Sequence, residues 1–334
     1  MKKTKYIFSS GRLERKDNTL KFTPVDPEGT KGGASYLPVV ELETLYFFGS
    51  IDANSNLYTF LGQNQIDVHF FDYYENYQGS FMPKEQLLSG ELVIRQSQAY
   101  TDKKHRLRLA RAFVYGAVGN IQKNLRYYER REKPLTDFIS TIEKLEEQLE
   151  AAADISALMG LEGNIRQTYY QAFDHILEGF EMGNRSRQPP SNEVNALISF
   201  GNSLCYTLCM NAIYHTQLNP TISFLHQPGR RRYSLALDLA EVFKPILVDK
   251  VIFTVLNRKI VQKEHFERKM EGCFLKENGR KKFIEVWQEK LKETFKHPEL
   301  KKSISYKHLI KVECYKLIND LLGIETYKPF KMRW

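Results

Sequence analysis

The chain has 334 residues, of which 42% are hydrophobic and 13% aromatic, so it is large and apolar enough for two folded domains and is not disordered. It has no run of about eighteen apolar residues, and its first residues lead into a strand-like alternation rather than a signal peptide, so we expect a cytoplasmic protein without a membrane partner. The net charge of +9 favours partners that carry phosphate groups. The four cysteines are too scattered for a disulfide framework, and Cys205 and Cys209 are predicted to face a helical core.

Short runs of alternating apolar and polar residues dominate the first part of the chain. The predicted strands are, in order, residues 5–9, 12–16, 20–23, 45–48 and 67–72, and a short helix is predicted at about 54–65. Turn residues such as Asp17-Asn18 and Gly32-Gly33 separate the runs. This pattern predicts a small β-rich domain over residues 1–90.

From about residue 95 onward, apolar residues recur three and four positions apart in long segments, which predicts helices. The expected fold class is therefore α+β, with the β-rich domain followed by a larger all-α domain over residues 91–334. Clusters of basic residues all lie in this second part, at residues 103–111, 123–133, 230–232, 280–282 and 328–333. A single basic run usually forms a solvated helix face, but the run at 230–232 lies between candidate site residues.

A predicted helix at about 155–182 places Glu162 within a stripe of apolar residues. An ionised carboxylate is not buried without a cation or a proton to balance it, so Glu162 is expected to have a partner. That partner is an arginine or water if the role is structural, and a metal ion if it is functional. Gly160 and Gly163 flank Glu162 and are expected to let another backbone approach closely.

A second helix is predicted at about 193–215, with a capping signal at Ser191-Asn192 and one strongly apolar face. Asn195 and Tyr206 leave that face, and each is expected to reach either a site or solvent. The helix itself is predicted to belong to the core.

A third helix follows the arginine run and extends to about Lys244, where Pro245 must end or kink it. Asp238 and Glu241 are three positions apart on this helix, so both carboxylates project from one side, at the edge of its apolar face. His226 lies on a proline-bracketed turn just before it. A single histidine is more often a surface or core residue than a ligand, but the neighbouring carboxylates favour a functional role here.

Carboxylates with one imidazole and no thiolate form a ligand set for Mg²⁺ or Mn²⁺, and the imidazole favours the softer Mn²⁺. The sequence has no Ser-His-Asp pattern, no glycine loop of the P-loop type and no dinucleotide fingerprint after a strand. The residues therefore predict a divalent-metal site and no organic cofactor.

Several stretches of the chain, taken together, resemble the Cas-one family of CRISPR-associated adaptation integrases. They are Leu161-Glu-Gly-Asn164, Val194-Asn-Ala-Leu-Ile-Ser-Phe-Gly201, Phe224-Leu-His226, the run from Ser234 to Pro245, and Tyr327-Lys-Pro-Phe-Lys-Met-Arg-Trp334. The resemblance spans nearly the whole chain, and its specificity comes from the order and spacing of Glu, His and the Asp-x-x-Glu pair.

This resemblance implies that Glu162, His226 and Glu241 are ligands of a divalent metal, and that Asp238 is an accessory acidic residue beside them. Many relatives have aspartate at the third ligand position, where the longer Glu241 keeps the charge but alters the geometry. The resemblance also implies a homodimer formed through the β domain. Two such dimers would flank a dimer of the small Cas-two protein, in a heterohexamer that inserts spacer DNA into the CRISPR array.

Such a protein would catalyse attack of a DNA 3′-hydroxyl on a phosphodiester of the CRISPR repeat, without a covalent enzyme intermediate. We expect one well-defined metal per protomer, because the ligands are few, and a second metal only where DNA supplies phosphate oxygens. Arg230, Arg231, Arg232 and Lys244 are predicted to hold phosphates of the double-stranded DNA.

Two other functions fit the same residues. The protein could be a metal-dependent nuclease that acts on branched or repair DNA, which a strand-transfer assay distinguishes from an integrase. It could also be a non-catalytic DNA-binding scaffold whose acidic cluster only stabilises the helical domain. In that case, alanine at Glu162 would change the melting temperature but not the DNA chemistry.

Overall fold

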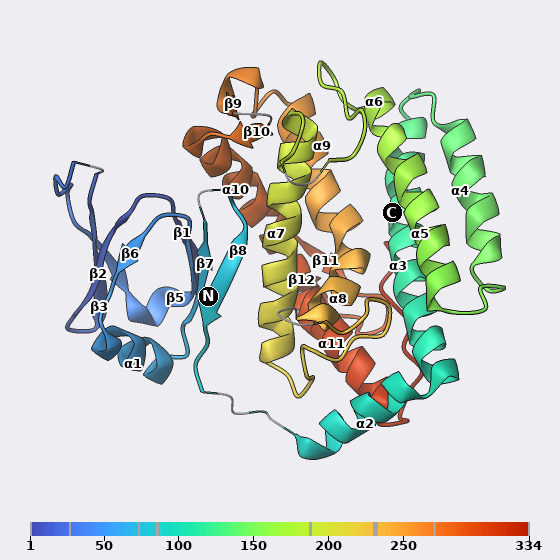
Figure 1. The fold of residues 1–334 in the computed structure, drawn as a ribbon, viewed down its shortest axis with the longest axis horizontal. Helices are drawn as coiled ribbons and strands as arrows, with labels where there is room; N and C mark the ends of the chain where they lie inside the picture. The colour runs from blue at the N-terminus through green and yellow to red at the C-terminus, as the bar shows by residue number, and fades with distance from the viewer. Residues whose placement is uncertain are drawn as a thin grey trace. The chain divides into compact units, whose positions relative to one another are not determined.

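The computed structural model describes residues 2–26, 28–72, 74–84, 87, 89–186, 189–229, 233–269 and 272–332. The chain divides into two compact units, residues 1–86 and residues 87–334. The first is rich in strands and the second is mainly helical, as Figure 1 shows. The predicted α+β class, with the β-rich part first, is confirmed.

In its described residues, the N-terminal unit contains two four-stranded sheets, one α-helix and a short 3-10 helix at Val39–Glu41. One sheet has the order β1-β5-β7-β8, and the other has the order β4-β3-β2-β6. The strands are β1 (Lys3–Ile7), β2 (Gly11–Lys16), β3 (Thr19–Pro24), β4 (Ser35–Pro38), β5 (Leu42–Phe47), β6 (Ile51–Asp52), β7 (Asp67–Phe71) and β8 (Tyr77–Phe81). Alternating side chains from both sheets and from helix α1 (Ser55–Gln63) form one apolar core, which includes Leu13, Leu45, Leu57 and Val68.

The five predicted strands and the predicted helix are all present in this unit. Strands β4, β6 and β8 were not predicted from the sequence. Strand β6 has only two residues, β4 is mostly exposed, and β8 reads Tyr-Gln-Gly-Ser-Phe, so none of them shows a clear apolar alternation.

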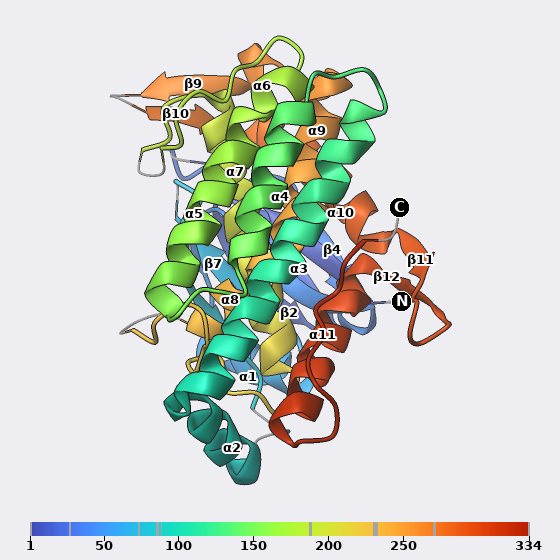
Figure 2. The ribbon, with the colours of Figure 1, turned by 90° about the vertical axis from the view of Figure 1, so that its right-hand side faces the viewer.

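The second unit is built from ten α-helices and two small hairpins in the part of the chain that the structure describes. The helices are α2 (Gly90–Thr101), α3 (Lys103–Glu129), α4 (Thr136–Gln148), α5 (Ile155–Gln171), α6 (Phe173–Ile176), α7 (Glu193–Tyr214), α8 (Ser234–Lys244), α9 (Lys250–Asn257), α10 (Glu277–Lys292) and α11 (Tyr306–Leu321). The hairpins pair β9 (Phe266–Lys269) with β10 (Gly272–Leu275), and β11 (Thr294–Lys296) with β12 (Ser303–Ser305). The unit is therefore mainly helical, with two small hairpins that were not predicted from the sequence. Figure 2 shows α3, α4 and α5 side by side on one face.

Helix α7 forms the middle of this unit and contacts α8, α11 and α9. It is long and apolar enough to cross a membrane by length and composition, but 67% of its most apolar window is buried inside the fold. Cys205 and Cys209 on this helix are buried and unbridged, as predicted. These features identify α7 as a core helix.

The helix that carries Glu162 is shorter than predicted. Helix α5 ends at Gln171, the short α6 follows, and the chain has left helical geometry by Leu177. The Asp174 carboxylate accepts a hydrogen bond from the backbone N–H of Met182, and Gly179 has a φ of +75°, so local turn chemistry ends the helix despite the continuing apolar pattern.

Pro245 does not end the helical path of α8 but changes its type. Residues Pro245–Asp249 form a π-turn that leads directly into α9. Such a turn is a local irregularity of the kind that proline was expected to introduce. It carries Asp249, which is buried behind the candidate site.

A C-terminal segment, residues 327–332, packs across helix α3 and supports α8. A Cβ atom on Gly116 would lie 2.7 Å from the Cβ of Pro329, so only glycine permits this close approach. The Asn120 amide donates to the carbonyls of Val242 and Phe330, at 3.0 Å each. This one side chain thus joins α3, α8 and the C-terminal segment.

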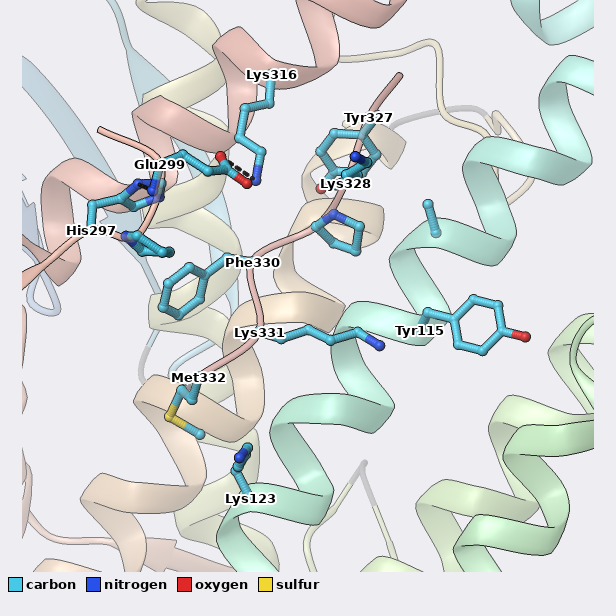
Figure 3. Close-up of a pocket in the computed structure, with 13 residues that line it drawn as sticks. Tyr115, Lys123, His297, Glu299, Lys316, Tyr327, Lys328, Phe330, Lys331 and Met332 are labelled. Carbon is cyan, nitrogen blue, oxygen red and sulfur yellow. Dashed lines mark hydrogen bonds and ion pairs between the residues drawn. The ribbon is translucent and has the colours of Figure 1, made fainter. Parts of the chain in front are cut away.

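A hollow of about 840 Å³ lies beside this segment. Figure 3 shows Phe330, Lys331 and Met332 next to it, with Tyr115 and Lys123 projecting from α3. Its described lining residues include none of the four predicted site residues.

Candidate active site

His226 and Asp238 form a tightly bonded pair. The Asp238 side chain is fully buried on α8, and its Oδ2 accepts from the backbone N–H groups of Phe224 (2.6 Å) and Leu225 (3.0 Å). Its Oδ1 accepts from the backbone N–H of His226 (2.9 Å) and lies 2.8 Å from His226 Nδ1. A proton on Nδ1 satisfies this contact, so Nε2 is left with a lone pair for another partner.

The pKa of His226 reflects this pairing. Burial alone would lower the pKa, but the hydrogen bond and the negative charge of Asp238 outweigh burial, and the pKa is raised above 6.5. Both Asp238 oxygens are occupied by groups of the protein itself. Its geometry therefore suits a positioning role on His226, and its accessory role beside a metal ion stays a prediction.

Glu241 lies one helical turn after Asp238 but contacts different partners. Its carboxylate accepts from the Lys244 ammonium and from the Arg166 guanidinium. Burial acts to raise the pKa of Glu241, but the two cations dominate and lower it to about 2. The charge of Glu241 in turn raises the pKa of Lys244, although burial opposes this. Both groups are therefore ionised at neutral pH.

Glu162 is paired with Arg166, and an arginine is the partner that the sequence analysis expected for a structural role of Glu162. Both residues lie on α5, where Arg166 Nε and Nη2 lie 3.3 and 3.2 Å from Glu162 Oε1. The same Nη2 also donates to Glu241, so one guanidinium connects two carboxylates that are far apart in the sequence. The sequence analysis did not identify Arg166, although its i,i+4 spacing from Glu162 is a signal for an ion pair.

Asp249 and Tyr169 lie behind Arg166, and neither was identified from the sequence. Burial raises the pKa of Asp249 to about 7, although the Arg166 charge and a hydrogen bond with Tyr169 act to lower it. The Tyr169 hydroxyl also accepts from Asn124, whose amide donates to the carbonyl of Pro245 at 2.8 Å. Asn124 thus connects α3 to α5 and to the π-turn beside the site.

Several other predicted features do not join this cluster. Asn195 is buried and bonds to the loop at residues 182–186, and Tyr206 accepts a hydrogen bond from the backbone N–H of Tyr233. A Cβ atom on Gly160 or Gly163 would meet nothing within 4 Å, so the expected close approach of another backbone is wrong. The predicted phosphate-binding residues Arg230, Arg231 and Arg232 lie outside the described residues.

The donor types of this cluster fit a divalent cation. Two carboxylates and an imidazole whose other nitrogen is held by a carboxylate are common ligands of Mn²⁺ and Mg²⁺. Their present arrangement does not converge on one point, because Arg166 and Lys244 occupy the Glu241 oxygens. Among the described residues, no three His, Cys, Asp or Glu side chains are gathered closely enough to hold one ion.

Comparison with solved structures places the fold of this chain in the structural class of the Cas1 proteins. The structure of the Cas1 protein from Thermotoga maritima is similar, with a TM-score of 0.85 at 35% identity over 97% of this chain and 98% of that one. A casposase bound to its integration product shares the fold, with a TM-score of 0.84 at 19% identity over 100% of this chain and 94% of that one.

Sequence comparisons agree with this class. The family model described as CRISPR associated protein Cas1 matches residues 5–289. A relative from Moorella thermoacetica, named CRISPR-associated endonuclease Cas1 2, is 46% identical over 332 residues, which cover 99% of this chain and 100% of that one. The chain belongs to the Cas1 family, which confirms the resemblance found in the sequence.

Proposed function

We propose that this protein is a metal-dependent DNA integrase of CRISPR adaptation, which joins a DNA 3′-hydroxyl to a phosphodiester of the CRISPR repeat. One observation supports this proposal most directly. His226 is fixed by Asp238 with Nε2 available, in the same site as the ionised Glu241, and Arg166 links Glu241 to Glu162. Family membership supports the DNA chemistry.

In the proposed mechanism, Glu162, His226 Nε2 and Glu241 would hold one Mg²⁺ or Mn²⁺ ion. Such an ion would supply positive charge to polarise the phosphoryl oxygen and to stabilise the charge on the displaced oxygen. Asp238 keeps the imidazole in the tautomer that leaves Nε2 unprotonated. Lys244, whose ammonium stays charged beside Glu241, attracts the phosphate, and Arg230, Arg231 and Arg232 extend this positive charge along the double-stranded DNA.

The proposed assembly is a homodimer formed through the β-rich domain, residues 1–90, while residues 91–334 carry the catalysis. Two such dimers flank a Cas2 dimer in a heterohexamer that acts in the cytoplasm on spacer-precursor DNA and the CRISPR repeat. Family membership supports this assembly. Analytical ultracentrifugation of the chain with and without Cas2 tests it, and a monomer that does not bind Cas2 would refute it.

Strand transfer on a supercoiled plasmid that carries a CRISPR repeat tests the chemistry. The reaction contains short duplex DNA, Mn²⁺ or Mg²⁺, the matching Cas2 protein, and wild type, His226→Ala or His308→Ala. His308 is an exposed histidine on α11 and serves as the matched control. We expect metal-dependent joining that falls at least about hundredfold in His226→Ala and is retained in His308→Ala. Equal joining by His226→Ala and His308→Ala would refute the assignment of His226 to the active site.

A nuclease is the second candidate, because the Moorella relative is named an endonuclease. The same site would then direct water, rather than a DNA 3′-hydroxyl, at the phosphodiester. Metal-dependent cutting of the plasmid without joining in the same assay would support the nuclease.

A further inference from the structure

Arg166 occupies an unusual position, since its guanidinium lies between two carboxylates that are proposed as ligands of the same ion. Its side chain is 13% exposed, and it contacts Glu162, which is 23% exposed, and Glu241, which is 7% exposed. A surface ion pair of this type on one helix would stabilise the protein only slightly. This guanidinium is instead buried and spans α5 and α8.

The two carboxylates proposed as ligands are already paired with cations of the protein. Glu162 and Glu241 contribute two negative charges, and Arg166 and Lys244 contribute two positive charges. A divalent cation that bound both carboxylates would lie close to these two positive groups, and like charges repel strongly in a largely buried region. Binding therefore requires one of the resident cations to leave the carboxylates.

Asp249 is a candidate second partner for Arg166. Asp249 is 2% exposed, and its Oδ2 has no hydrogen-bond partner among the described residues. Arg166 Nη1 is likewise buried without a partner among those residues. The Asp249 charge acts to raise the pKa of Arg166, and the Arg166 charge acts to lower the pKa of Asp249, so each side chain lies within the electrostatic influence of the other. A guanidinium has five donors in a planar fork, so a change of side-chain torsion can satisfy Asp249.

We propose that Arg166 is a displaceable counter-cation: it holds Glu162 and Glu241 until a divalent cation takes these carboxylates, and it then turns to Asp249. Arg166 is a positioning residue in this scheme, because it acts through the ligands and does not touch the substrate. It keeps two like charges close together in a buried site, and it weakens binding of the cation by the cost of its own displacement. The inference depends on the proposed metal site.

Calorimetric titration of the full chain with Mn²⁺ alone tests this inference. Arg166→Met removes the charge but keeps the apolar stem, so we expect binding at least about tenfold tighter than in wild type. Asp249→Asn removes the acceptor for the displaced guanidinium and should weaken binding several-fold. Arg108→Met is the control, because Arg108 pairs with the buried Asp320 away from this site. It should leave Mn²⁺ affinity unchanged.

The outcomes separate this inference from the proposed function. Unchanged or weaker Mn²⁺ binding by Arg166→Met, with wild-type binding that His226→Ala abolishes, would overturn the role of Arg166 but keep the metal site. If neither wild type nor Arg166→Met showed Mn²⁺ binding that requires His226, both the metal site and the role of Arg166 would be overturned.

A wild-type measurement covers the case in which Arg166→Met does not fold. Lysine keeps the positive charge but has no guanidinium Nε–H, so the signal that is lost from the NMR spectrum of Arg166→Lys is that of Arg166. In wild type, this signal should shift during a titration with diamagnetic Mg²⁺, with the same midpoint as binding. A signal that does not move while Mg²⁺ binds would refute displacement.

Discussion

Replacing Asp238 by asparagine should release the turn that carries His226 from helix α8. The carboxylate now accepts four hydrogen bonds from residues 224–226, three from backbone N–H groups and one from the His226 ring. Asparagine offers one carbonyl oxygen, and its amide would point donors at donors. About two buried N–H groups would then lack an acceptor, at about 1–3 kcal/mol each, so we expect a local loss of roughly 3 kcal/mol.

Hydrogen exchange is the appropriate assay because it reports this turn separately from the rest of the molecule. A loss of roughly 3 kcal/mol corresponds to an increase of about hundredfold in the exchange rates of the Phe224, Leu225 and His226 amides. Asp137→Asn, at an exposed position in the first turn of α4, is the control and should leave these three amides unchanged. Unaltered protection in Asp238→Asn would show that Asp238 does not hold the turn.

Three further predictions concern pH and close packing. The folded-state pKa of Asp249 is raised to about 7, so the free energy of unfolding of the wild type should decrease as pH rises from about 4 to 7. Urea unfolding at different pH values should show that Asp249→Asn removes most of this decrease. Because metal ligation needs an unprotonated Nε2, Mn²⁺ affinity should fall as pH decreases through the raised pKa of His226, and a flat profile in calorimetry would contradict this. Gly116→Ala should destabilise the helical unit by about 1–3 kcal/mol, because the added methyl group would clash with Pro329. Gly160→Ala meets no neighbour within 4 Å and should raise the melting temperature slightly. Equal melting temperatures of the two variants would contradict this reasoning.

The sequence was sufficient to identify the separate parts of the site but not their connections. The spacing of Asp238 and Glu241 correctly placed both on one side of a helix, and the apolar stripe around Glu162 correctly indicated that it needs a partner. The different roles of the two helix-α8 carboxylates depend on which segment packs against each. Asp238 contacts the turn before α8, whereas Glu241 contacts Arg166 on α5, which is 75 residues away in the sequence. Helical periodicity contains no information about such long-range contacts.

Local chemistry explains the other differences between prediction and structure. The apolar pattern continues past Gln171, but the bond between Asp174 and the Met182 backbone closes a loop there instead. A periodic pattern records which side chains are buried, and a buried loop can show the same pattern as a helix. Asp249 was missed for a related reason, because a single acidic residue in an apolar run gives no indication of its neighbours.

The C-terminal segment, residues 327–332, affects the order in which the helical unit can form during protein synthesis. Glu162, His226 and Glu241 leave the ribosome well before this segment, yet Asn120 holds the carbonyl of Val242 on α8 together with that of Phe330. Because domains fold as the nascent chain emerges, α8 can form all of its stabilising contacts only after the C-terminal segment has been synthesised. A translation product that stopped before Tyr327 would contain every candidate ligand, but the helix that carries Glu241 would lack one of its anchors.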